Sequence, residues 1–309
     1  ASDVYKRQTY KFEVEYFFEG RFPAIHFGCM PPEKENLLEE AIKTSREADA
    51  VILIVGTNSD WETEGNDRSN LALPADQDKL IESVIKENAN TVVVINSGSP
   101  VSMPWINDSN AILQSWFGGQ EYGNALADLI FGEINPSGKL PTTFPVQIED
   151  TPAFDYYPGK NSQMNYEEKL LIGHRWYERK GKKPLFPFGF GLSFTKFSFS
   201  DLEVIKKDDL NINCKFRIKN FGEMDGQEVA QCYVAFLEAE EDEPLKTLQS
   251  FKKVFIEKNK EIELEISLNK RNFSYWDVDK KDWMVKPGEY RIDIGSSSEK
   301  IELSEIIVL

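Results

Sequence analysis

The chain of 309 residues has room for two domains, carries a formal net charge of −16, and has the ordinary apolar content of a globular protein. So acidic a chain is not expected to bind nucleic acid or an anionic membrane, because both need clustered Lys and Arg, and no apolar run approaches a membrane-spanning length. With two histidines and three widely spaced cysteines, the sequence predicts no metal site, no cofactor and no disulfide framework.

The N-terminal residues predict the end of a β domain. Residues 1–8 fit no pattern that follows and are interpreted as an artefact, a translated sequencing-adapter remnant. Residues 10–18 alternate apolar and polar side chains, which is the period of a strand, and residues 22–27 can return as a second strand. Two strands alone are not stable in water, so residues 9–30 predict the tail of a domain whose body lies elsewhere.

Residues 31–194 alternate apolar strands with amphipathic helices. Continuous apolar strands in this arrangement predict a mostly parallel, flavodoxin-like sheet covered by helices on both faces, which is an α/β sandwich. The loops that leave the strands then share one sheet edge, where ligands and catalytic groups collect in such folds. The pattern predicts, in order, a helix from residue 33, a strand at 51–55, a helix opened by Pro74, strands at 91–95 and 111–113, and a helix after Gly119.

The C-terminal part, residues 195–309, predicts an all-β, immunoglobulin-like sandwich. Short β patterns recur there with turn signals between them, which is typical of this architecture. Cys214 and Cys232 lie inside two of these patterns and are expected to be buried strand residues. The patterns cover residues 212–218, 229–236, 262–268 and 290–294.

The acidic loop, residues 61–68, is the most informative part of the sequence. Trp61 offers a flat face for a sugar ring beside the carboxylates of Glu62 and Glu64. Glycoside hydrolysis needs one acid and a second carboxylate, about 5 Å apart on opposed walls in retaining enzymes. In an extended segment these two glutamates project to one side, about 7 Å apart, so one can be the acid while the nucleophile comes from elsewhere. A solvated loop with Asp67 and Arg68 in turn contacts is the alternative.

Other chemical motifs are weaker. Ser97 and Ser99 do not form G-x-S-x-G, so a serine hydrolase is not expected. Gly118 and Gly119 resemble a phosphate loop only loosely and lack a following Lys-Ser/Thr, which favours a tight strand-to-helix turn. Trp116 can line a site or pack in the core.

Several blocks, in the same order, resemble the β-glucosidases of glycoside hydrolase family 3. The resemblance covers residues from about 33 to the C-terminus and implies a glycosidase α/β domain at 31–194 and a fibronectin type III-like domain at 195–309. Residues 9–30 resemble the end of a PA14 domain. The blocks are residues 56–58, 61–68, 73–74, 116–128, 135–141 and 186–193.

The resemblance implies a retaining exo-β-glycosidase acting on β-linked glucosides or short oligosaccharides. Glu64, which precedes Gly-x-Asp-Arg, corresponds to the general acid/base, and Glu62 is the second choice. Asp67 and Arg68 match the motif and are expected to support the loop. The remaining candidate substrate contacts are Trp61 and Trp116.

The family's nucleophile is an Asp on an N-terminal (β/α)8 barrel that this chain does not contain. The chain alone is therefore predicted to be inactive and to need that barrel in cis. A non-catalytic carbohydrate-binding or scaffold module is the alternative. Glycoside specificity and assembly into a homo-oligomer stay open, as does the compartment, for which a cytoplasmic location is slightly favoured over a secreted or periplasmic one.

Overall fold

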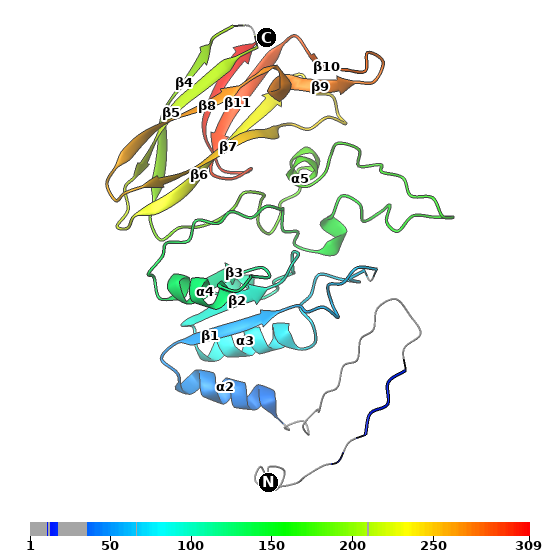
Figure 1. Ribbon diagram of the computed structural model, residues 1–309, viewed down its shortest axis with the longest axis vertical. Coiled ribbons are helices and arrows are strands. Elements are labelled where there is room, and N and C mark those ends of the chain that lie inside the picture. Colours follow the sequence, from blue (N-terminus) through cyan, green and yellow to red (C-terminus); the bar gives the residue numbers. More distant parts are fainter. Residues whose placement is uncertain (1–10, 12, 18–35, 66, 209) are drawn as a thin grey trace.

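Figure 1 shows two parts stacked along the long axis, an α/β part and a β-sandwich that contains the C-terminus. This computed structural model describes residues 11, 13–17, 36–65, 67–208 and 210–309. The strand predicted at 10–18 is wrong for residues 11 and 13–17, which form no strand, because strand structure needs a hydrogen-bonded neighbour. The rest of that strand, and the one predicted at 22–27, lie outside the described residues.

The α/β part is built on a parallel sheet with the order β1-β2-β3, as predicted. Apolar residues of the strands and of α3 form one core, in which Val55 and Val93 meet Ile81 and Ile85. Figure 1 shows α2 and α3 together on one side of this sheet. The elements are α2 (Leu37–Glu47), β1 (Val51–Gly56), α3 (Gln77–Glu87), β2 (Thr91–Asn96), η1 (Ile106–Asp108), β3 (Ala111–Gln114) and α4 (Tyr122–Ile130).

The start of α3 differs from the prediction. Pro74 lies ahead of the helix, because Ala75 takes a positive φ of 52° and breaks the helical path before Gln77. The Gln77 side chain accepts from the Gly56 N–H at 2.8 Å and donates to the Gly56 carbonyl at 2.9 Å. This pair of hydrogen bonds ties the start of α3 to the end of β1, so the loop between them leaves and returns at nearly one point.

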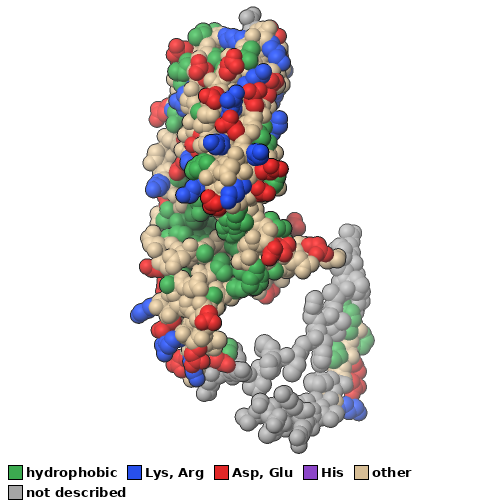
Figure 2. All heavy atoms as spheres, turned by 90° about the vertical axis from the view of Figure 1, so that its left-hand side faces the viewer, with side chains coloured by type: hydrophobic (Ala, Val, Ile, Leu, Met, Phe, Trp, Pro, Cys, Tyr) green, Lys and Arg blue, Asp and Glu red, His purple; other side chains and the backbone are tan. Residues whose placement is uncertain are grey.

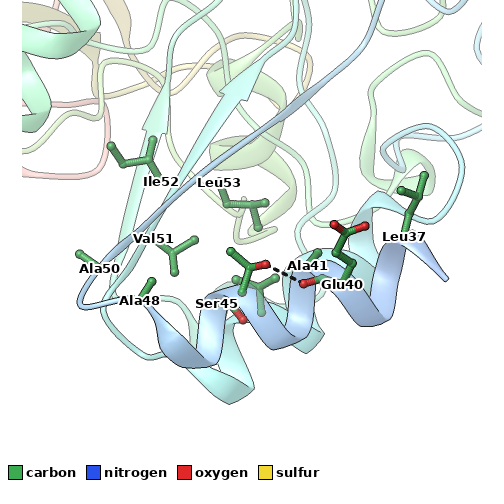
Figure 3. A pocket seen from close by; sticks show the side chains of 11 residues that line it. Leu37, Glu40, Ala41, Ser45, Ala48, Ala50, Val51, Ile52 and Leu53 are labelled. Atoms are coloured by element: carbon green, nitrogen blue, oxygen red, sulfur yellow. Dashed lines mark hydrogen bonds between the residues drawn. The ribbon is translucent and has the colours of Figure 1, made fainter. Parts of the chain in front are cut away.

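The prediction that helices cover both sheet faces is wrong for β1 within the described residues. Leu53 and Val55 face α3, whereas Ile52 and Ile54 point the other way and are 48% and 59% exposed. A groove of about 460 Å³ runs beside the outer edge of β1, lined by residues of α2 and β1, among them Leu37 and Ala41 (Figure 3). Among the described residues, no strand pairs with that edge of β1.

The C-terminal sandwich consists of the sheets β4-β5-β8 and β12-β11-β6-β7, as the alternating patterns predict. Their inner faces share one core, in which Cys214 and Cys232 are both fully buried, also as predicted. A two-stranded hairpin, β9-β10, extends from it. The elements are β4 (Phe197–Lys206), β5 (Ile212–Asn220), β6 (Gly226–Phe236), β7 (Thr247–Ile256), β8 (Glu261–Leu268), η3 (Lys270–Phe273), β9 (Ser274–Asp277), β10 (Asp282–Val285), β11 (Glu289–Gly295) and β12 (Ile301–Val308).

An irregular segment with η2 (Ile148–Asp150) and the short helix α5 (His174–Lys180) joins the two parts. The His174 ring stacks on Phe188, with centroids 5.0 Å apart, and meets Tyr233 of β6 edge-on at 5.9 Å. A largely buried ion pair joins Lys139 to Glu228 of β6 at 2.8 Å. Figure 2 shows apolar side chains gathered at the waist between the parts. The sandwich is therefore packed against the joining segment.

Candidate active site

The acidic loop leaves the carboxyl end of β1 through a tight turn. The N–H groups of Trp61 and Glu62 both donate to the Asn58 carbonyl, at 3.0 and 2.8 Å. The Asn58 side chain accepts from the Asp60 N–H at 3.0 Å, which is the self-contained turn that asparagine favours. The turn brings Glu62 back over the end of the strand.

Glu62 is held at the base of this loop, and its side chain is only 15% exposed. Its Oε1 accepts from the Thr57 hydroxyl at 2.8 Å and lies 3.6 Å from Nη1 of Arg68. Its Oε2 occupies space beside Gly98, where an added Cβ would come within 2.6 Å. The two glutamates therefore differ in their surroundings, since Glu62 is held through Oε1 at the base of the loop.

Arg68 joins the acidic loop to the loop that follows β2. Its side chain is 12% exposed, and Nη1 donates to the Ser99 hydroxyl at 2.8 Å and to the Pro100 carbonyl at 3.2 Å. Burial lowers the pKa of the guanidinium, and the charge of Glu62 opposes that effect. Ser99, which the sequence offered as a weak nucleophile candidate, is thus a partner of the buried cation.

Glu64 lies at the exposed tip of the loop, two residues beyond the anchored Glu62. Within the described residues its carboxylate makes no hydrogen bond or ion pair. The next residue, Gly65, has a φ of 85° and no heavy atom within 4 Å of the position a Cβ would take. The tip is therefore unobstructed, and Glu64 is the loop glutamate that can reach a ligand.

Asp67 is also exposed, on the returning limb of the loop, and its carboxylate accepts a hydrogen bond from the Tyr157 hydroxyl. This bond raises the pKa of the Tyr157 phenol. Tyr157 belongs to the joining segment, and nothing in the sequence patterns identifies it as a site residue. Thr57 and Gly98 are likewise absent from the predicted site, although both lie in strand-end loops where functional groups were expected.

The two tryptophans occupy different surroundings. Trp61 is half-buried, and its indole Nε1 has no hydrogen-bond partner among the described residues. Trp116 has a φ of 57° and meets the buried Phe144 edge-on, with ring centroids 6.1 Å apart. Trp116 therefore packs on the core of the α/β part, and Trp61 stands beside the carboxylates.

The described part of the chain contains no group of three or more His, Cys, Asp or Glu side chains placed to hold a metal ion. None of its helices has the length and apolar character that crossing a bilayer requires.

Comparison with known proteins gives two family matches. Residues 6–194 match the family described as Glycosyl hydrolase family 3 C-terminal domain, and residues 228–298 match the one described as Fibronectin type III-like domain. The chain is 43% identical over 276 residues to Thermostable beta-glucosidase B of Acetivibrio thermocellus, which covers 88% of this chain and 37% of that protein. It is 37% identical over 310 residues to Beta-glucosidase of Kluyveromyces marxianus, covering 96% and 36%.

Solved structures give the same result. The crystal structure of the Kluyveromyces marxianus beta-glucosidase in complex with glucose superposes with a TM-score of 0.86 at 36% identity, over 91% of this chain and 34% of that one. A beta-glucosidase of Bifidobacterium adolescentis gives 0.86 at 37% identity, over 91% and 42%. The chain thus spans roughly a third to two fifths of the length of these relatives.

Proposed function

Since this chain belongs to glycosyl hydrolase family 3, we propose that it is the C-terminal part of a retaining exo-β-glucosidase and supplies the general acid/base, Glu64. The single observation that carries this assignment is the contrast between the two loop glutamates. Glu62 is held by Thr57 and faces Arg68, whereas Glu64 is exposed at the tip and has no partner among the described residues.

A group that donates and then recovers a proton must reach the glycosidic oxygen in both half-reactions. Glu64 meets that condition, because its carboxylate is accessible and no side chain of the described residues competes for it. Glu62 is suited to a structural role, since its side chain is largely buried and its Oε1 accepts from Thr57 and faces Arg68. Asp67 and Arg68 then act by holding the returning limb. Trp61, on the same loop as Glu64, is the preferred aromatic candidate for contact with sugar, because Trp116 packs on the core.

Double displacement also needs a nucleophilic carboxylate about 5–5.5 Å from the acid, on the opposite side of the scissile bond. Glu62 cannot face Glu64 in this way, because it lies on the same loop and is buried at its base. The nucleophile is therefore assigned to the (β/α)8 barrel that the family resemblance implies, outside this chain. The substrates are β-linked glucosides or short oligosaccharides.

The proposed domain division is 1–8 as an artefact, 9–30 as the PA14-like tail, 31–194 as the α/β domain and 195–309 as the fibronectin type III-like domain. The last boundary is supported by β4, the first strand of the sandwich, which begins at Phe197.

Resequencing the source DNA across codons 1–8 tests the artefact hypothesis, which fails if the same codons recur.

The decisive experiment uses the complete protein and substrates that differ only in leaving group. Glu64→Ala should reduce hydrolysis of cellobiose by about 10²–10⁴-fold, because its poor leaving group depends on protonation. In the same variant, hydrolysis of a dinitrophenyl glucoside should be limited by the second half-reaction, in which the glycosyl-enzyme is hydrolysed. Azide should restore the rate of that step. Glu62→Ala is the matched control, and the assignment is wrong if that variant shows the azide signature while Glu64→Ala does not.

The chain by itself is expected to hydrolyse no aryl β-glucoside. Turnover by the purified chain that disappears in Glu64→Gln would overturn the assignment of the nucleophile to another domain. Glucose binding by the chain, together with full activity of Glu64→Ala in the complete protein, would favour a carbohydrate-binding module instead.

A further inference from the structure

A tyrosine from the joining segment contacts the acidic loop. The Tyr157 hydroxyl donates to Oδ2 of Asp67, across 90 residues of sequence. Tyr157 lies between η2 and α5, in the segment that joins the α/β part to the β-sandwich. Its side chain is otherwise open, since the residue is 49% exposed. Tyr157 is therefore connected to the acidic loop through this hydrogen bond.

The contact falls on the returning limb between Glu64 and Arg68, where the described residues make no other side-chain hydrogen bond. The outgoing limb is fixed by the Asn58 turn and by the bond between Thr57 and Glu62. On the returning limb, Arg68 is fixed by Ser99, but the stretch from Glu64 to Asp67 includes Gly65 in open space. Tyr157 holds this limb at a point three residues from Glu64.

We propose that Tyr157 is a positioning residue that holds the returning limb through Asp67, so that the Glu64 carboxylate is set for proton transfer. The inference rests on the proposed function, because it assigns Tyr157 a role in placing the acid. Tyr157 acts through Asp67, and the proton is transferred by Glu64.

If Tyr157 positions Glu64, removing its hydroxyl should reduce the rate of hydrolysis by an amount that depends on the leaving group of the substrate. Misplacing a reacting group by about 1 Å costs up to about 10²-fold, and full loss of a general acid costs about 10²–10⁴-fold. Removing one of the four supports named above should therefore reduce the rate of cellobiose hydrolysis by about tenfold. A dinitrophenyl leaving group departs without protonation, so formation of the glycosyl-enzyme from that substrate, followed as the pre-steady-state burst, should change less than about twofold.

Tyr157→Phe is the test variant, because it keeps the ring and removes only the hydroxyl. Tyr156→Phe is the matched control, since that neighbouring tyrosine is also exposed and its hydroxyl makes no hydrogen bond within the described residues. In the chain alone, Tyr157→Phe should speed amide hydrogen exchange of residues 63–69 and leave α3 unchanged. In the complete protein, it should show the leaving-group-dependent loss, and Tyr156→Phe should show neither effect.

Asp67→Ala should reproduce the loss, and combining it with Tyr157→Phe should add little, because both changes break one hydrogen bond. Faster exchange without leaving-group dependence would make the contact merely structural and overturn the proposal, as would additive losses. If Tyr157→Phe has no effect while Glu64→Ala is azide-rescued, the Tyr157 inference fails and the proposed function stands. If Glu64→Ala retains full activity on cellobiose, the proposed function itself fails.

Discussion

Acid should destabilise the junction between α5 and the β-sandwich, because His174 would have to gain a proton while buried. Burial, with the positive charges of Arg175 and Lys246, lowers the pKa of His174 from 6.5 to about 4. Between pH 6.5 and 4, the unfolded chain therefore binds more protons than the folded chain. The free energy of unfolding falls as the pH drops from about 6.5, and the loss is complete below about 4. At about 1.4 kcal/mol per pKa unit, the complete effect is about 3 kcal/mol.

The ionisable groups around His174 do not all change the stability in the same direction as the pH falls. Burial raises the pKa of Glu178, which lies one turn further along α5 and forms a 2.9 Å ion pair with Lys246. The folded state therefore holds the proton of Glu178 more tightly, and that group gains stability as the pH falls. Its effect opposes that of His174, so the slope of the wild-type chain alone does not isolate the histidine.

His174→Phe isolates the titration of His174, because a phenyl ring can keep the stacking on Phe188 and has no proton to gain. Urea denaturation followed by circular dichroism at pH 7.5 and 4.5 gives the free energy of unfolding of both chains. Between these two pH values the free energy of unfolding of the wild type should fall by about 2 kcal/mol more than that of the variant. Equal losses in the two chains would refute the account of His174 as a buried neutral imidazole.

Three further predictions concern the acidic loop and the open edge of β1. Arg68→Met leaves the Glu62 carboxylate, 15% exposed, without its cation, and should lower the free energy of unfolding in urea by about 2 kcal/mol. Adding Glu62→Gln should recover part of that loss, and simple additivity would contradict the pairing. Gly98→Ala places a Cβ within 2.6 Å of Glu62 Oε2, so amide exchange in residues 57–73 should accelerate; unchanged exchange would show that the site has room. The chain should self-associate through β1 in sedimentation velocity, and Ile52→Thr with Ile54→Thr should reduce this, whereas a monodisperse wild-type monomer would count against the idea.

The sandwich strands could be predicted closely because their alternation has a single physical cause. Cys214, Phe216 and Ile218 all point into one core, while Lys215 and Arg217 between them do not. A period-two pattern over such a strand therefore determines which residues are buried. The same reasoning failed at residues 11 and 13–17, where alternation is present without a described neighbouring strand.

The start of α3 could not be predicted from the sequence in the same way. Pro74 is compatible with the first turn of a helix, and local preference favours it there. The helix instead begins at Gln77, whose side chain bonds both backbone groups of Gly56, 21 residues earlier. A contact of this kind depends on the tertiary structure, which local propensity does not describe.

The candidate site was predictable as a location but not as an arrangement. The sequence places Glu62 and Glu64 in the loop after a strand, and that loop does follow β1. Which of them is engaged depends on Thr57, Arg68 and Gly98, and the last lies on a different loop. Tyr157 is more remote still, since it reaches Asp67 from a segment with no regular pattern.

With Glu64 as the proposed acid, the loop has to be both exposed and ordered. An acid must stay accessible to substrate, and accessible loop tips are also the least ordered parts of a fold. Placing Glu62 inside the base orders the outgoing limb, because its charge faces the buried Arg68 and its Oε1 accepts from Thr57. Glu64 can then stay exposed, because it is placed through the backbone on either side of it. In the proposed function, the buried Glu62 therefore orders the loop that presents the exposed Glu64.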